Sequence, residues 1–295
     1  MHNFKKNVKL YIVESGNKHS IEVYSDVSAS QTFDEQSNKL KTLHNLNALH
    51  ESASITKANV ADFSFTTPIH NTATTPIILT LGTTYSSGTV SSFDIYIESD
   101  NVIYKIEKAV VESMTFNIER NAILTVSVSG SASKLLLHST LAAPVAIPGT
   151  PVVTSKIYAP VRGLNVSIAG TTLTTIASVN IDIANEVSWL NYNTLQNSLA
   201  GNIAYPSNYV VQGRTLSGSV TEFLTTENVN TITDTSTVAP LVLDIYDGNS
   251  IPILKFNLPS VVFTRRLNME EIFNRVYDYR LNSNSTNVKP IYKGV

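Results

Sequence analysis

Alternation of apolar and polar residues between positions 110 and 130 is the feature that most restricts how this chain can fold. Met114, Phe116 and Ile118 alternate with polar residues, the run breaks at 119–122, and a second alternating run follows. Successive side chains of a β-strand point to opposite faces of the sheet. The pattern therefore predicts a long antiparallel hairpin with one buried face and one polar face.

The same two-residue period recurs along most of the chain, and helical periodicity is scarce. A second amphipathic strand is predicted at Ile176–Ala184. A third hairpin is predicted at Leu241–Leu258, around the turn Asp247–Ser250, because Asp-Gly is a strong turn signal. Further strands are expected at Val8–Val13, Ile21–Ser25, Asp62–Thr66, Ser92–Ile97, Val102–Ile106, Val161–Ile168 and Arg214–Phe223.

Helices should be few and short. One is expected at Thr75–Leu81, where Pro76 would occupy a first helical position, and another within Glu186–Leu199. The segment Asn268–Tyr279 has a helix-like charge pattern, although its bulky aromatic residues argue against a helix. The sequence thus predicts an all-β fold, an antiparallel β-sandwich or β-barrel with one or two short helices.

Two halves of the chain, about 1–141 and 152–295, resemble each other. The pattern around Met114 recurs around Val179 at an offset of 65, and the return strand around Val126 recurs around Leu216 at an offset of 90. The second hairpin would then hold an insertion of 25 residues, within 185–212. The connector 142–151 contains three prolines and a glycine, so it is expected to join the halves without regular structure.

Composition excludes several kinds of site. Only 15% of the 295 residues are charged and the net charge is -2, so no basic field exists to attract nucleic acid or an anionic membrane. The absence of cysteine excludes disulfides, thiolate metal sites and thiol catalysis. The six histidines lie at no common metal-ligand spacing, and no phosphate loop or nucleophile motif occurs. We expect no cofactor, no metal and no enzymatic activity.

The chain resembles the tail tube proteins of bacteriophages over about residues 60–265. The stretch 102–114 is similar to the family's central strand region, where an aromatic strand leads through V-x-S into an alternating hairpin. The blocks 176–185 and 213–219 are similar to its second characteristic region, and 76–82 resembles the short segment before the sheet. The first 55 residues and the last 25 match no part of the pattern.

This resemblance implies a β-sandwich subunit that forms rings, commonly hexamers, whose inner sheets join edge to edge into one β-barrel. Stacked rings would make a hollow tube for the genome and the tape-measure protein, with a sheath around it in a contractile phage. The strands of the first hairpin contain neither Lys nor Pro to blunt their edges, so a neighbouring subunit could pair with them.

The polar faces of the two hairpins would then line the channel. Small neutral or acidic side chains offer DNA phosphates nothing to bind, whereas basic residues would hold the polymer. The residues expected to face the lumen are Ser113, Thr115, Asn117, Glu119, Thr125, Ser127, Ser129, Asn180, Asp182, Thr215, Ser217 and Ser219.

An aromatic cluster lies within the insertion. Trp189, Tyr192, Tyr205 and Tyr209 are expected to pack a loop or to contact a neighbouring subunit. A sugar-binding platform is the alternative for such a cluster.

Three functional interpretations remain open at this point. The first is a structural tail tube subunit, and the second is a tube initiator, tube terminator or baseplate hub component with the same fold. The third is a β-sandwich adhesin or lectin. The N-terminal region lacks the apolar stretch of a signal peptide, and no segment could form a membrane helix. We therefore expect a virion protein that assembles in the host cytoplasm and does not insert into a membrane.

Overall fold

The computed structural model describes residues 8–24, 27–38, 52–70, 76–83, 85–86, 89–99, 102–119, 121–153, 160–190, 204–228, 236–247, 252–269, 271–282 and 291–292. These residues form strands almost throughout, with one short helix, α1 (Ile77–Thr83). None of the helical residues in these ranges makes a span long and apolar enough to cross a membrane. The strands are β1 (Lys9–Glu14), β2 (Asn17–Ile21), β3 (Ser28–Ser30), β4 (Phe33–Asn38), β5 (Ser52–Ala58), β6 (Ala61–Pro68), β7 (Tyr85–Ser86), β8 (Thr89–Val90), β9 (Phe93–Ser99), β10 (Val102–Ile118), β11 (Thr125–Ala132), β12 (Lys134–Thr140), β13 (Thr150–Val152), β14 (Gly163–Ile168), β15 (Thr171–Leu173), β16 (Ile176–Leu190), β17 (Asn208–Phe223), β18 (Ser236–Tyr246), β19 (Pro252–Asn268), β20 (Asn274–Leu281) and β21 (Ile291–Tyr292).

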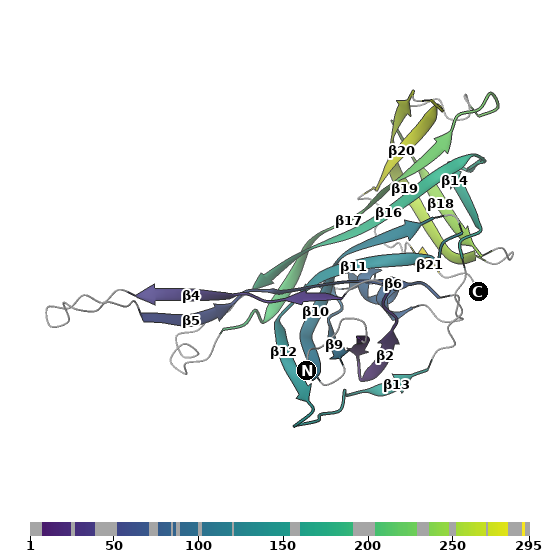
Figure 1. Ribbon diagram of the computed structural model, residues 1–295. Coiled ribbons are helices and arrows are strands. Elements are labelled where there is room, and N and C mark those ends of the chain that lie inside the picture. The colour runs from purple at the N-terminus through teal and green to yellow at the C-terminus, as the bar shows by residue number, and fades with distance from the viewer. Residues whose placement is uncertain are drawn as a thin grey trace.

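Two sheets share the long strand β10 (Figure 1). The small sheet has the order β12-β10-β9-β1-β2-β13, antiparallel except between β2 and β13. The large sheet has the order β3-β6-β11-β10-β16-β17-β20-β19-β18-β14-β15, antiparallel throughout. Strand β10 passes from one sheet to the other near Lys108, which has a φ of 56° and whose backbone N–H donates to Asp94.

The core lies on the apolar face of the large sheet. Phe116 of β10 and Phe256 of β19 meet edge to face with ring centroids 5.2 Å apart, so strands far apart in the sheet order pack against each other. Helix α1 buries Ile78, Leu79 and Leu81 in the same cluster. Since this face is covered, the opposite face of the central strands is the one left for water or a partner.

Most of the expected strands are confirmed, as are the all-β fold and the helix near Thr75–Leu81. The expected strand Ile21–Ser25 is wrong in position, because β2 already ends at Ile21. Ser15 and Gly16 form a two-residue turn with φ values of 48° and 81°, as in type I′ hairpins, so the second strand starts at Asn17. The Asp247–Ser250 turn lies mostly outside the described residues, but β18 and β19 flank it as a hairpin.

Neither of the two helix-like segments is helical where the structure describes it. The described part of Glu186–Leu199, residues 186–190, extends β16 and pairs with the start of β17. The segment Asn268–Tyr279 instead runs from the end of β19 into β20. In both places pairing with a neighbouring strand outweighs a weak local helical preference.

The prediction of open edges on the first hairpin is also wrong. Strand β10 is paired on both sides, by β11 and by β16. Strand β11 is likewise paired by β10 and β6. Strands from distant parts of the same chain therefore occupy the edges that were assigned to a neighbouring subunit. The end of the connector 142–151 is also ordered, because Thr150 begins β13 beside β2.

Candidate functional site

The polar face of the large sheet is the candidate site. Strand registers align its side chains in three rows that run straight across the sheet, and these rows are numbered along β10 from Ser113 toward Ile118. Row 1 contains Ser28, Ser64, Ser129, Ser113, Ala184 and Thr215. Row 2 contains Thr66, Ser127, Thr115, Asp182, Ser217 and Arg280. Row 3 contains Pro68, Thr125, Asn117, Asn180, Ser219 and Asp278.

These rows bring together all the residues predicted to face a lumen except Glu119, which lies exposed just beyond the end of β10. The sequence analysis missed the outer members of the rows, Ser64 and Thr66 on β6 and Arg280 on β20. The alternation of Asp62–Thr66 was sufficient to find the β6 residues. Arg280 was not found because the helix-like charge pattern before it obscured the alternation of β20.

The polar side chains of the rows bond mainly to one another. The Thr115 hydroxyl donates to Asp182 Oδ1 at 2.7 Å, and Asn180 Nδ2 donates to Asp182 Oδ2 at 2.9 Å. The Thr66 and Ser127 hydroxyls lie 3.1 Å apart, within hydrogen-bonding distance. Since cross-strand partners already use many of the donors and acceptors, the face has a reduced capacity to bind a passing polar molecule.

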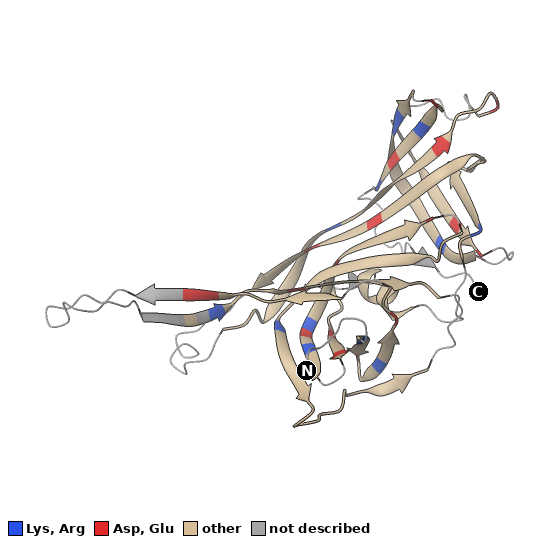
Figure 2. Ribbon diagram, viewed as in Figure 1, with Lys and Arg blue, Asp and Glu red and all other residues tan. Residues whose placement is uncertain are grey.

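Charge is sparse on this face (Figure 2). Within the three rows the only Lys or Arg is Arg280, and the only acids are Asp182 and Asp278. Asp278 is paired with Arg266 of β19 at 2.7 Å. The centre of the face therefore presents hydroxyls, amides and the Asp182 carboxylate, and the one cation within the rows lies at the β20 end.

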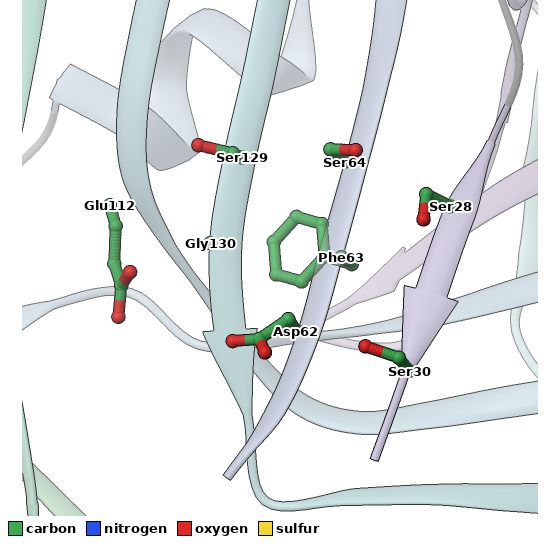
Figure 3. Close-up of a pocket in the computed structure, with 8 residues that line it drawn as sticks. All are labelled: Ser28, Ser30, Asp62, Phe63, Ser64, Glu112, Ser129 and Gly130. Carbon is green, nitrogen blue, oxygen red and sulfur yellow. The ribbon is translucent and has the colours of Figure 1, made fainter.

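An acidic cavity of about 270 Å³ lies at the other end of the face, beside β3 (Figure 3). Burial raises the pKa of Glu112, and the nearby Asp62 carboxylate raises it further, although a hydrogen bond from the Ser131 hydroxyl acts in the opposite direction. Two carboxylates thus face one cavity without a Lys or Arg among its walls. The lining residues are Ser28, Ser30, Asp62, Phe63, Ser64, Glu112, Ser129 and Gly130.

The predicted aromatic cluster makes contacts within the chain. The Trp189 indole donates to the Ser131 hydroxyl at 2.7 Å, and its ring lies 5.2 Å from that of Tyr209. Lys134 lies over the Tyr205 ring at 4.7 Å, and Tyr192 falls outside the described residues. These contacts hold the extended ends of β16 and β17 against β11 and β12. A role for the cluster between subunits stays a prediction.

Two glycines, Gly130 of β11 and Gly218 of β17, leave room for an aromatic ring from the neighbouring strand to lie over their backbone. A Cβ on Gly218 would lie 2.1 Å from the Asn180 carbonyl oxygen and 2.5 Å from the Tyr279 hydroxyl. Because no Cβ is present, Tyr279 reaches across β17 and donates to that carbonyl at 3.0 Å. Gly130 makes similar room for the Phe63 ring. Both rings cover the backbone of a glycine that would otherwise weaken its strand.

A buried ion pair between Glu222 and Arg275 lies at the end of β17. Glu222 is fully buried and Arg275 is 3% exposed, with Arg275 Nη1 3.2 Å from Glu222 Oε1. The Tyr277 hydroxyl donates to Glu222 at 2.8 Å, and Arg275 donates to the carbonyl of Asn228 at 3.5 Å. Burial raises the pKa of Tyr277 to about 12, with Arg275 opposing and Glu222 adding to the shift.

This tyrosine should make the protein sensitive to alkali. A phenol with a pKa of 10.0 when unfolded and about 12 when folded keeps its proton better in the folded state. Its contribution to stability is complete below the unfolded value and is lost as the pH rises through the folded value. Urea unfolding at pH 9 and pH 11 should show this decrease. Tyr277→Phe should make the decrease smaller, and an unchanged pH dependence in that variant would contradict the assignment.

Comparison with known proteins gives the chain a family. The model of the bacteriophage baseplate tube protein family matches residues 1–295, the whole chain. No curated protein matches the sequence. The family match agrees with the resemblance carried by the two hairpins and gives no support to an adhesin or lectin. The chain therefore belongs to the bacteriophage baseplate tube protein family and is a non-enzymatic structural component of the phage tail and baseplate.

Proposed function

We propose that copies of this chain form a ring around a channel at the baseplate end of the tail tube, and that the polar face of the large sheet is the channel wall. The observation that carries this proposal is the alignment of three rows of small polar side chains across strands β6 to β17. The baseplate description of the family favours a tube component of the baseplate over the repeating subunit of the main tail tube.

The chemistry of the face suits a conduit for DNA. Each phosphate that a Lys or Arg neutralises adds affinity, so a wall rich in cations would hold DNA. Asn117 and Asn180, which face each other across β10 and β16, are exposed and neutral. The Asp182 carboxylate repels phosphate. DNA and a tape-measure protein could thus pass without stable contacts, while other tail proteins would bind the ends of the ring.

Adding cations to this wall tests the proposal. We expect Asn117→Lys with Asn180→Lys to leave rings intact and to make them bind double-stranded DNA on the order of tenfold or more tightly at low salt, since each copy gains two phosphate contacts. Rings would be checked by electron microscopy, and DNA binding measured from 50 to 200 mM salt. The matched control is Thr172→Lys with Thr174→Lys, which adds the same charge at two exposed residues on and just after β15, away from the rows.

Two outcomes would count against the proposal. Equal DNA binding by Asn117→Lys with Asn180→Lys and by Thr172→Lys with Thr174→Lys would mean that the rows do not line the channel. A chain that stays monomeric at high concentration would remove the ring itself.

A further inference from the structure

The antiparallel pair β4–β5 projects away from the other strands as an arm (Figure 1). The Asn59 side-chain amide fixes the base of this arm, because it donates to the Thr32 hydroxyl at 3.1 Å and to Asp34 Oδ1 at 2.9 Å. A second attachment leads out of the arm. The Ala58 backbone N–H donates to the Ala204 carbonyl at 2.9 Å. The arm is therefore joined to a segment that is distant in the chain.

Residues 204–209 run from this attachment into the first residues of β17, and we call them the strap. Side chains from two other strands hold the strap at its centre. The Ser133 hydroxyl donates to the carbonyl of Pro206, and Lys108 Nζ donates to the carbonyl of Ser207. Pro206 itself is buried. The strap is thus fixed along its length and not only at its two ends.

The two residues that hold the strap are the places where the chain passes between the two sheets. Lys108 separates the part of β10 that belongs to the small sheet from the part that belongs to the large sheet. Ser133 separates β11 of the large sheet from β12 of the small sheet, and its backbone N–H donates to the Glu107 carbonyl at 3.1 Å. The strap therefore crosses the junction of the two sheets and is hydrogen-bonded to both crossing points.

The other end of the strap lies at the edge of the polar face. The Tyr209 ring packs against Trp189, which is its partner across β16 and β17 and which donates to Ser131 of β11. From Tyr209, β17 continues to the row 1 residue Thr215. One short segment thus contacts the arm, the sheet junction and the strand that carries part of the polar face.

We propose that the strap couples the arm to the body of the chain, so that a displacement of the arm passes through Ala204 to the sheet junction and to the start of β17. Neighbouring hydrogen bonds commonly open together as one cooperative unit. A load that another tail protein places on the arm would then reach the edge of the polar face. The coupling is a property of a single chain, so it does not depend on the proposed ring.

Hydrogen exchange read at single amides tests the coupling from the strap to the arm. Lys108→Met with Ser133→Ala removes the two central contacts of the strap. If the strap is one unit, exchange should become about tenfold faster at residues 207–210 and also at the Ala58 amide, which bonds to the far end of the strap. Exchange in β18 should stay unchanged, which would show that the effect is local.

The matched control is Lys9→Met with Ser20→Ala, which removes the same two residue types from the small sheet. Lys9 forms an exposed ion pair with Glu98 at 3.7 Å, and Ser20 is exposed on β2. This control should leave exchange at the Ala58 amide as it is in the natural chain. If circular dichroism shows a loss of strands in the first double variant, Lys108→Met alone takes its place with the same expected direction.

Tryptophan fluorescence tests the coupling in the opposite direction. Trp189 is the one tryptophan of the chain, and it packs on the last residue of the strap. Asn59→Ala removes the hydrogen bonds at the base of the arm, so it should shift the Trp189 emission to longer wavelength. The matched control is Asn165→Ala, an exposed residue of β14, which should leave the emission unchanged.

Three results would overturn the inference. Faster exchange at residues 207–210 with no change at the Ala58 amide would mean that the strap and the arm move independently. Equally faster exchange throughout β18 would mean that the strap contacts serve only the stability of the whole chain. An unchanged Trp189 emission in Asn59→Ala would mean that the arm does not act on the start of β17. None of these measurements requires that rings form.

Discussion

Replacing Arg275 by Met is expected to lower the free energy of unfolding by about 3–5 kcal/mol, the usual cost of leaving a buried charge without its partner. Glu222 has no access to water, and only the Tyr277 hydroxyl would remain to stabilise its charge. The variant would also lose the hydrogen bond from Arg275 to the Asn228 carbonyl. The side-chain amide of Asn228 donates to the Phe223 carbonyl at the end of β17, so this end of the strand would be less well fixed. Urea unfolding at neutral pH measures the effect.

A surface ion pair between β20 and its other neighbour, β19, is the control. Arg266 and Asp278 lie 2.7 Å apart but are exposed, so Arg266→Met should cost only about 0–1 kcal/mol. Replacing both buried partners, Glu222→Gln with Arg275→Met, should recover part of the loss, since no charge then remains buried. If Arg275→Met and Arg266→Met lowered the free energy of unfolding by similar amounts, the buried ion pair would contribute no more to stability than the exposed one.

Truncating Phe116 to Ala should also cost about 3–5 kcal/mol. This side chain is 1% exposed and packs edge to face on Phe256, at the point where β10 meets β19. Its removal would leave a cavity between β10 and β19, which pack against each other on the apolar side of the large sheet. Thermal or urea unfolding would measure the loss, and circular dichroism would check that the strand content is retained.

Phe273 provides the comparison for this truncation. It lies 51% exposed at the β19–β20 turn, so Phe273→Ala should change the free energy of unfolding by less than about 1 kcal/mol. If the two variants were equally stable, the contact between β10 and β19 would not be part of the core.

The sequence predicted the polar face well because a two-residue period needs no knowledge of the partner strand. The alternation at Thr115 and at Asp182 assigned each to the polar side, and the register then set them opposite each other at 2.7 Å. What alternation cannot specify is which strands are neighbours. The edges of the first hairpin were therefore expected to be free, although β6 and β16 of the same chain pair with them.

The two strands that the predicted repeat matches, β10 and β16, are neighbours in the large sheet. Phe116 and Ile181 are separated by the predicted offset of 65, and they pair directly with each other, so the two matched strands are related by a local two-fold axis. The return strands do not follow this symmetry. Phe116 pairs with Val126, but Ile181 pairs with Gly218 rather than Leu216. The likeness of the complete halves therefore stays a prediction.

The pairing of strands that are distant in the chain also bears on how the protein must be made. The large sheet joins strands that are distant in the chain, such as β6 with β11 and β10 with β16, and chains with such non-local pairing fold slowly, on a scale of milliseconds to seconds. During that time the strands that still lack their partners remain available to any extended peptide. Synthesis faster than folding should therefore favour aggregation, so the yield of native protein would depend on temperature and on the rate of synthesis.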